Sequence, residues 1–90
     1  MPMDKRGFTK LGEELSELLQ VVMKKMACMD DDVHWDGSHL PTRLQDEMGD
    51  VIGAIKFVID KEHLDYEAIM QRAEFKHGLF VVWDHEPPEM

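Results

Sequence analysis

Two pairs of acidic residues have matching spacing in separate stretches of the chain. Glu14 and Glu17 form the first pair, and Glu47 and Asp50 form the second. Residues three positions apart lie on one face of a helix, one turn apart. Carboxylates that converge repel one another unless their pKa values rise or a cation neutralises them. Hard oxygen ligands select Mg²⁺, Mn²⁺ or Ca²⁺ over zinc, and such a site supports metal-assisted attack of water on a phosphate ester or anhydride.

Both acid pairs fall in stretches whose apolar residues recur every three or four positions, which predicts amphipathic helices. We expect one helix over residues 9–29 with Thr9 as its N-cap, and a second over about 42–61 with Thr42 as its N-cap. The first apolar stripe consists of Leu11, Leu15, Leu18, Val22, Met26 and Met29. The second consists of Leu44, Met48, Val51, Ile52, Ile55, Val58 and Ile59.

The acid pairs have the same placement relative to these stripes. With about 100° of rotation per residue, Glu14 and Glu47 lie on the shoulder of the apolar face, and Glu17 and Asp50 lie farther out. If the two helices pack side by side, all four acids converge at the edge of the bundle. Gly49, inside the second pair, suggests a packing or access requirement, because a glycine within a helix costs roughly 1 kcal/mol.

The rest of the chain supplies connections and one further helix. Residues 30–41 contain turn-forming aspartates, glycine and proline, so we expect a connecting loop there. A third helix should begin at Tyr66 after an Asp65 cap and run to about Lys76 or beyond, burying Ile69, Met70, Ala73, Leu79 and Phe80. Periodicity leaves open whether residues 80–83 are helical or extended, and residues 84–90 form a frayed tail.

Composition narrows the class of protein. The 90 residues carry a net charge of −9, which argues against nucleic-acid binding, because that usually needs a basic surface. A single cysteine excludes an intramolecular disulfide, and no apolar run is long enough to cross a membrane. We therefore expect one cytoplasmic domain over residues 1–90, all-α, built from two long antiparallel helices and one or two shorter ones. Because so short a chain has a thin core, its apolar stripes should be completed by oligomerisation.

The segments Glu-Glu-Leu-Ser-Glu-Leu-Leu-Gln at 13–20 and Glu-Met-Gly-Asp-Val-Ile at 47–52 resemble the MazG-like all-α nucleoside triphosphate pyrophosphohydrolases. Their signature is E-x-x-E on one helix and E-x-x-D on the next, and the similarity spans roughly residues 8–80. The resemblance implies that Glu14, Glu17, Glu47 and Asp50 bind Mg²⁺ for cleavage between the α and β phosphates. It also implies a nucleoside triphosphate substrate and a homodimer or homotetramer.

Further residues are candidates for catalysis and substrate binding. Glu13, Glu14 or Glu47 would orient the attacking water. Candidate substrate ligands are Lys25, Trp35, Arg72 and Lys76, with Lys10 and Lys24 as further basic candidates. The chain departs from the family where Ala73 stands three residues before Lys76, a place where members tend to carry Asn, and the segment between Glu17 and Glu47 is long for the family.

A second interpretation is a non-catalytic acidic helical module, such as a DNA mimic or a regulator that acts through its dimer surface. A mimic would spread its acids over a face, whereas here they cluster at two matched positions. The spacing therefore favours the enzyme.

Overall fold

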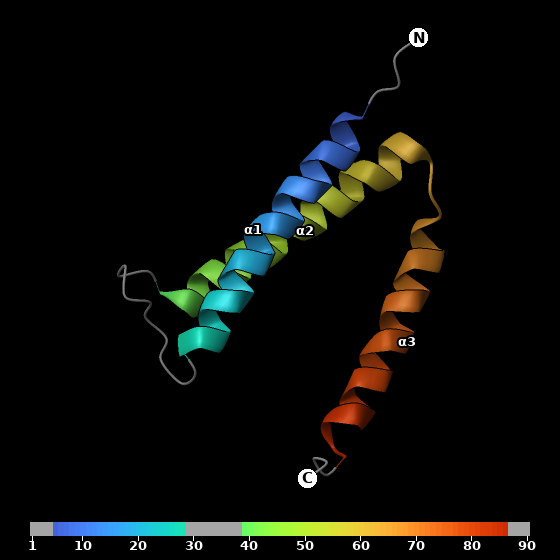
Figure 1. Ribbon diagram of the computed structural model, residues 1–90. Coiled ribbons are helices and arrows are strands. Elements are labelled where there is room, and N and C mark those ends of the chain that lie inside the picture. Colours follow the sequence, from blue (N-terminus) through green and yellow to red (C-terminus); the bar gives the residue numbers. More distant parts are fainter. Residues whose placement is uncertain (1–4, 29–38, 87–90) are drawn as a thin grey trace.

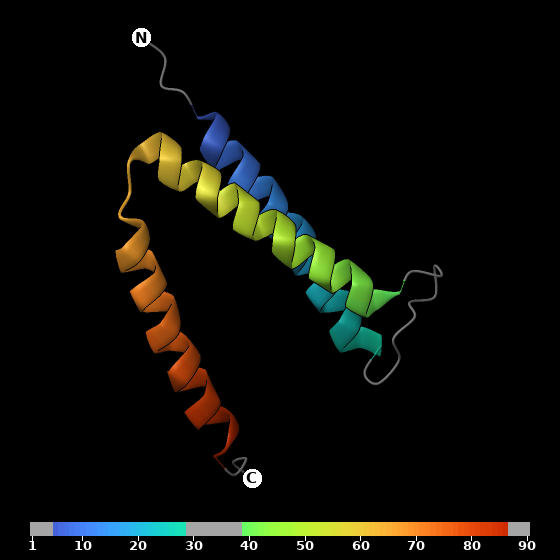
Figure 2. The same ribbon diagram turned by 180° about the vertical axis from the view of Figure 1, so that it is seen from behind.

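The computed structural model describes residues 5–28 and 39–86. It contains helices α1 (Arg6–Cys28), α2 (Leu40–Glu62) and α3 (Tyr66–Asp84). Figure 1 shows α1 and α2 lying side by side and running in opposite directions, while α3 turns back beside α2 and diverges from the pair. The view from behind in Figure 2 gives the same arrangement. The predicted all-α class with two long antiparallel helices is confirmed.

The seam between α1 and α2 follows a seven-residue repeat. On α1 the two buried residues are Gly7 and Val21, and Glu14 lies midway between them. On α2 the buried residues are Leu40, Val51, Ala54, Val58 and Ile59. Glu47 follows Leu40 by seven residues and precedes Ala54 by seven. Both glutamates therefore lie on the face that each helix turns toward the other.

The predicted apolar stripe of the first helix was right only in part, since Leu11, Leu18 and Val22 are half-buried. Leu15 and Met26 are 49% and 64% exposed, whereas the omitted Val21 is fully buried. The apolar residues of α1 cover more than one face, and the side that packs on α2 includes a glycine and a glutamate. A stripe drawn through the largest apolar residues is therefore rotated relative to the real seam.

Two of the predicted helix starts need correction. The first helix begins at Arg6, so Thr9 lies inside it and donates its backbone N–H to the Lys5 carbonyl. The second begins at Leu40, with His39 as its N-cap. His39 Nδ1 accepts from the Thr42 N–H and lies 2.7 Å from the Thr42 hydroxyl. The loop predicted over 30–41 is therefore shorter at its end, and its residues up to 38 lie outside the described residues.

The connection between α2 and α3 agrees with the sequence. His63 closes α2 in the left-handed region (φ 53°, ψ 45°), and its N–H donates to the Ile59 carbonyl. Asp65 caps α3 as predicted, accepting from the Ala68 N–H at 3.1 Å. The segment 80–83, left open by periodicity, is helical, because α3 continues to Asp84. The predicted frayed tail begins at that last helical residue, and its residues 87–90 lie outside the described residues.

The predicted burial of α3 was wrong for this single chain. No residue of α3 is buried, and Ile69 alone among the five predicted core positions is half-buried. The physical reason is the divergence of α3 from α2, which leaves its apolar side chains without a packing partner along most of the helix (Figure 1). Among the described residues, no helix is long and apolar enough to span a membrane.

Candidate metal centre

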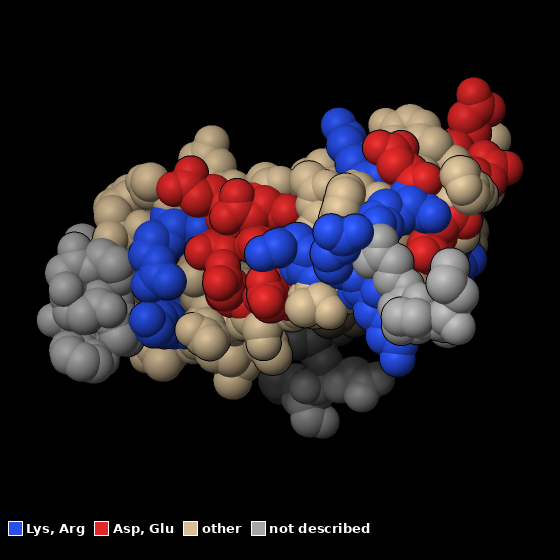
Figure 3. Space-filling model, turned by 90° about the horizontal axis from the view of Figure 1, so that it is seen from above, with Lys and Arg blue, Asp and Glu red and all other residues tan. Residues whose placement is uncertain are grey.

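Three of the four predicted acids meet at the middle of the seam between α1 and α2. Glu14 of α1 and Glu47 and Asp50 of α2 each offer a carboxylate oxygen, and these oxygens lie within 4.8 Å of one another. Glu14 and Glu47 are half-buried, whereas Glu17 and Asp50 are exposed, as the helical angles predict. Figure 3 shows acidic side chains gathered on this face, with basic side chains on either side of them.

Two oxygen atoms at the centre of this group lack a hydrogen-bond partner. Glu14 Oε2 and Glu47 Oε2 are both shielded from solvent, and no donor within the described residues reaches either of them. A buried carboxylate oxygen without a donor is unfavourable unless the group is protonated or a cation lies beside it. The two inner acids therefore call for either a proton or a cation at the seam.

The pKa values of the two inner acids also indicate that negative charge is crowded at this place. Burial raises the pKa of Glu14 above the ordinary range, and the nearby charges of Glu17 and Asp50 raise it further. Burial is also the largest cause of the raised pKa of Glu47, again reinforced by Glu17 and Asp50. Glu17 is thus an electrostatic neighbour of both inner acids, although it is outside the group of three that shares an oxygen cluster. A cation would relieve this repulsion.

A basic residue stands four positions before each inner acid. Lys10 lowers the pKa of Glu14, and Arg43 lowers that of Glu47, each by its positive charge. Lys10 is among the predicted basic candidates, whereas Arg43 is not. The matched i, i+4 spacing in the two helices was the signal available for finding it.

The donor set fits a small hard cation. All three groups offer carboxylate oxygen, the ligand that Mg²⁺ and Mn²⁺ prefer, and no sulfur or imidazole nitrogen belongs to the group. Asp50 is exposed, so one side of the group stays open to water and to a substrate. Magnesium typically keeps several waters and takes one or two carboxylates together with substrate phosphates, which suits such an open site.

The remaining predicted site residues lie apart from the acid group. Glu13 is exposed and accepts a hydrogen bond from Lys10 Nζ at 2.8 Å. Lys25 lies in the last turn of α1, three turns beyond Glu14. Arg72 and Lys76 are on α3, where they lie over the rings of Phe75 and Phe80, respectively. Trp35 lies outside the described residues.

Gly49 lies within the second acid pair, and its surroundings are open. A Cβ atom added there would meet nothing within 4 Å, so no packing contact within the chain explains the glycine. Of the two reasons that the sequence suggested, packing is therefore excluded among residues 5–28 and 39–86.

Comparisons with family models, with curated proteins and with solved structures found no match to this chain.

Proposed function

We propose that the protein is a magnesium-dependent nucleotide pyrophosphohydrolase of the MazG-like type. It would cleave the α–β anhydride of a nucleoside triphosphate or deoxynucleoside triphosphate, giving the monophosphate and pyrophosphate. The observation that carries the proposal is the close approach of Glu14, Glu47 and Asp50, with an unpartnered buried oxygen on each of the two glutamates. The sequence signature that led to the same residues supports it independently.

The four acids divide into inner and outer ligands. Glu14 and Glu47 would hold Mg²⁺ from within the seam, and Asp50 and Glu17 from its exposed edge. When bound, Mg²⁺ neutralises charge that develops on the phosphates and lowers the pKa of water. Mn²⁺ offers the same ligand preferences.

The inner acids are also the best candidates for orienting the attacking water. Both lie at the centre of the acid group, next to the place where a bound cation would hold a water. Glu13 is less suited to this role, because its carboxylate already accepts a hydrogen bond from Lys10. Water would attack one phosphorus of the α–β anhydride, and the bridging oxygen would leave with the other phosphate.

Positive charge beside the site would bind the rest of the triphosphate. Lys10 and Arg43, each four positions before an inner acid, act electrostatically on that acid and would attract the phosphates. Arg72 and Lys76 of α3 and Lys25 stay candidates for contacts farther along a nucleotide, and Trp35 for stacking on its base.

The test is a pyrophosphate-release assay over the common NTPs and dNTPs with Mg²⁺, in which the nucleotide product is identified. We expect pyrophosphate and monophosphate from at least one nucleotide. Glu47→Gln should lower the rate by roughly 100-fold or more, because the site loses both a ligand and a charge. Glu62→Gln, an exposed acid at the end of α2, is the matched control and should keep full activity.

Two results would contradict the proposal. Release of orthophosphate with a diphosphate product would place cleavage at the β–γ bond. No release from any nucleotide at high enzyme concentration would favour the non-catalytic acidic module.

The proposal includes self-association and a cytoplasmic location. A homodimer or homotetramer is supported by the exposed apolar residues along α1 and α3, among them Leu19 and Trp83. Abundant free nucleotide substrate is a property of the cytoplasm, which is where such an enzyme would act.

A further inference from the structure

Helix α3 is an apolar element that the rest of the described chain covers only along its first half. It carries four of the seven aromatic residues, and none of its residues is buried. Phe80 and Trp83, in its C-terminal half, are 56% and 71% exposed. Apolar side chains lie on every side of this helix, so no single face of it is suited to water. Such a helix is stable when other helices surround it.

The accessible surface of the chain is larger than that of a compact monomer of the same mass. Its accessible area is 7618 Å², whereas a compact monomer of 10.5 kDa exposes roughly 5,400 Å². Its radius of gyration is 16.5 Å, against about 12 Å for a compact domain of this length. A dimer that covered this excess on both chains would bury roughly 4,400 Å² in total, which is in the range of obligate homodimers.

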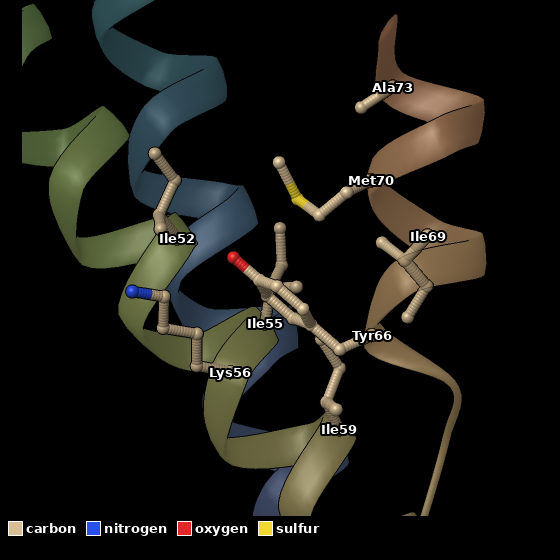
Figure 4. Close-up of a pocket in the computed structure, with 8 residues that line it drawn as sticks. All are labelled: Ile52, Ile55, Lys56, Ile59, Tyr66, Ile69, Met70 and Ala73. Carbon is tan, nitrogen blue, oxygen red and sulfur yellow. The ribbon is translucent and has the colours of Figure 1, made fainter.

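A groove between α2 and α3 offers the place for this burial. It has a volume of about 370 Å³ and is apolar except for one lysine and one tyrosine hydroxyl. Figure 4 shows Tyr66 and Met70 reaching from α3 toward Ile52 and Ile55 of α2. Ala73, the last lining residue on α3, is small and leaves the end of the groove open toward the exposed half of the helix.

We propose that a second copy of this chain fills the groove with its own α3. A two-fold arrangement sets the two α3 helices antiparallel, so that each covers the other over its whole length. The exposed half of one α3, with Phe80 and Trp83, then packs against the groove at Ala73 in the other copy. The two-fold axis repeats this contact, so that both grooves and both α3 helices are covered.

Charge favours a second copy over a lipid surface. Helix α3 has two basic and three acidic residues, so it carries little of the chain's net charge of −9. The core of a protein interface is depleted of charge and enriched in aromatic residues and Met, as this groove and helix are. Membrane-surface helices instead carry lysine and arginine on a polar face, and an acidic chain is repelled by anionic lipid.

This inference rests on the proposed self-association and is independent of the proposed hydrolysis. Its test is the molar mass in solution by sedimentation equilibrium, for the wild type and for Ala73→Glu. We expect about 21 kDa for the wild type, twice the 10.5 kDa chain, and at least a 30-fold weaker dimer for Ala73→Glu. Ala27→Glu makes the same change at an exposed position of α1 outside the groove and should leave the dimer intact.

A variant that fails to fold would also lose the dimer, so hydrogen exchange of the wild-type protein provides a second test that needs no variant. Amides of α3 should exchange more slowly as protein concentration rises, since only the paired form covers this helix. A wild-type monomer, or α3 protection that is independent of concentration, would overturn the inference. If Ala73→Glu left the dimer unchanged, the protein would still self-associate, but the groove would be excluded as the interface. Pyrophosphate release, measured separately, decides the hydrolysis.

Discussion

Glu14 and Glu47 are the residues at which stability and the proposed activity conflict. In each helix they occupy a position of the packed seam where an apolar residue would stabilise the pair of helices better. Instead they bring together carboxylates that raise one another's proton affinity. Such an arrangement is typical of a site that keeps a ligand position at the expense of stability.

Glu47→Gln should therefore move stability and metal response in opposite directions. The metal-free variant should melt at a higher temperature than the wild type, because it lacks one of the repelling charges. For the wild type, Mg²⁺ at about 100 times its Kd should raise Tm by roughly 10 °C, and this rise should be largely lost in Glu47→Gln. The measurement is thermal unfolding by circular dichroism with EDTA or with Mg²⁺.

Glu62→Gln is the control for this experiment, because it removes the same charge away from the site. A full Mg²⁺-dependent rise in Glu47→Gln, or an equal loss in Glu62→Gln, would mean that the cation acts by general charge screening. The three-acid site would then be wrong.

The raised pKa values also predict a pH dependence of the metal-free protein. A carboxyl whose pKa is higher in the folded state binds its proton first in that state, so folding is favoured as pH falls. Between neutral pH and the ordinary range of glutamate, Glu14 and Glu47 should therefore add stability as pH falls, and that stability is lost as pH rises through their raised pKa values. Thermal unfolding in EDTA from pH 7 to pH 5 measures this effect. A Glu14→Gln, Glu47→Gln double variant should show a weaker dependence, and an unchanged slope would contradict the assignment.

The sequence predicted the inner and outer acids correctly because helical rotation fixes angles along a single element. It could not predict which acids share an oxygen cluster, since that depends on the relative axial positions of two helices. Glu17 is therefore found beside the group and not within it. Arg43 was not among the predicted site residues, although it stands four positions before Glu47, as Lys10 does before Glu14.

In helix α2, a substitution at Gly49 distinguishes an effect on helix stability from an effect on access to the site. Neither Gly49 nor Gly53 has an atom within 4 Å of an added Cβ, so alanine at either position should stabilise α2 by roughly 0.5–1 kcal/mol. If Gly49 keeps space for the substrate beside Asp50, Gly49→Ala should lower pyrophosphate release several-fold, whereas Gly53→Ala should not. Urea unfolding and the release assay measure the two effects. Equal activity of the two variants would exclude a role for Gly49 in access.

The orientation of α1 shows why helix packing was harder to predict than helix existence. The repeat of apolar residues was sufficient to locate all three helices, but α1 has apolar residues on several sides. Val21→Ala tests the face that the structure selects, since Val21 is fully buried. We expect a loss of roughly 1–3 kcal/mol in the free energy of unfolding.

Met23→Ala is the matched control, because Met23 is on the same helix but 55% exposed. It should change the free energy of unfolding by less than about 0.5 kcal/mol. A larger effect at Met23 than at Val21 would mean that α1 packs through its other face.

For the whole molecule, the proposed self-association predicts that stability depends on protein concentration. If the chain folds as a dimer, a tenfold rise in protein concentration stabilises it by about 1.4 kcal/mol per mole of dimer. Tm should then rise on the order of 4 °C for each tenfold step. Melting curves at three concentrations measure this shift, and a Tm that stays constant would identify a monomer. The sequence predicted association from chain length, but the divergence of α3 depends on the αL turn at His63, which composition does not reveal.

The position of the two glutamates in the seam has a consequence for how α1 and α2 align. A slip of one helix along the other by seven residues would keep a repeating seam but would set each glutamate against an apolar residue. The acids would then be separated and buried without any shared cation. Glu14 and Glu47 thus specify the register of this antiparallel pair, as a single buried polar residue does in a coiled coil. An ion that binds them would select that register during folding.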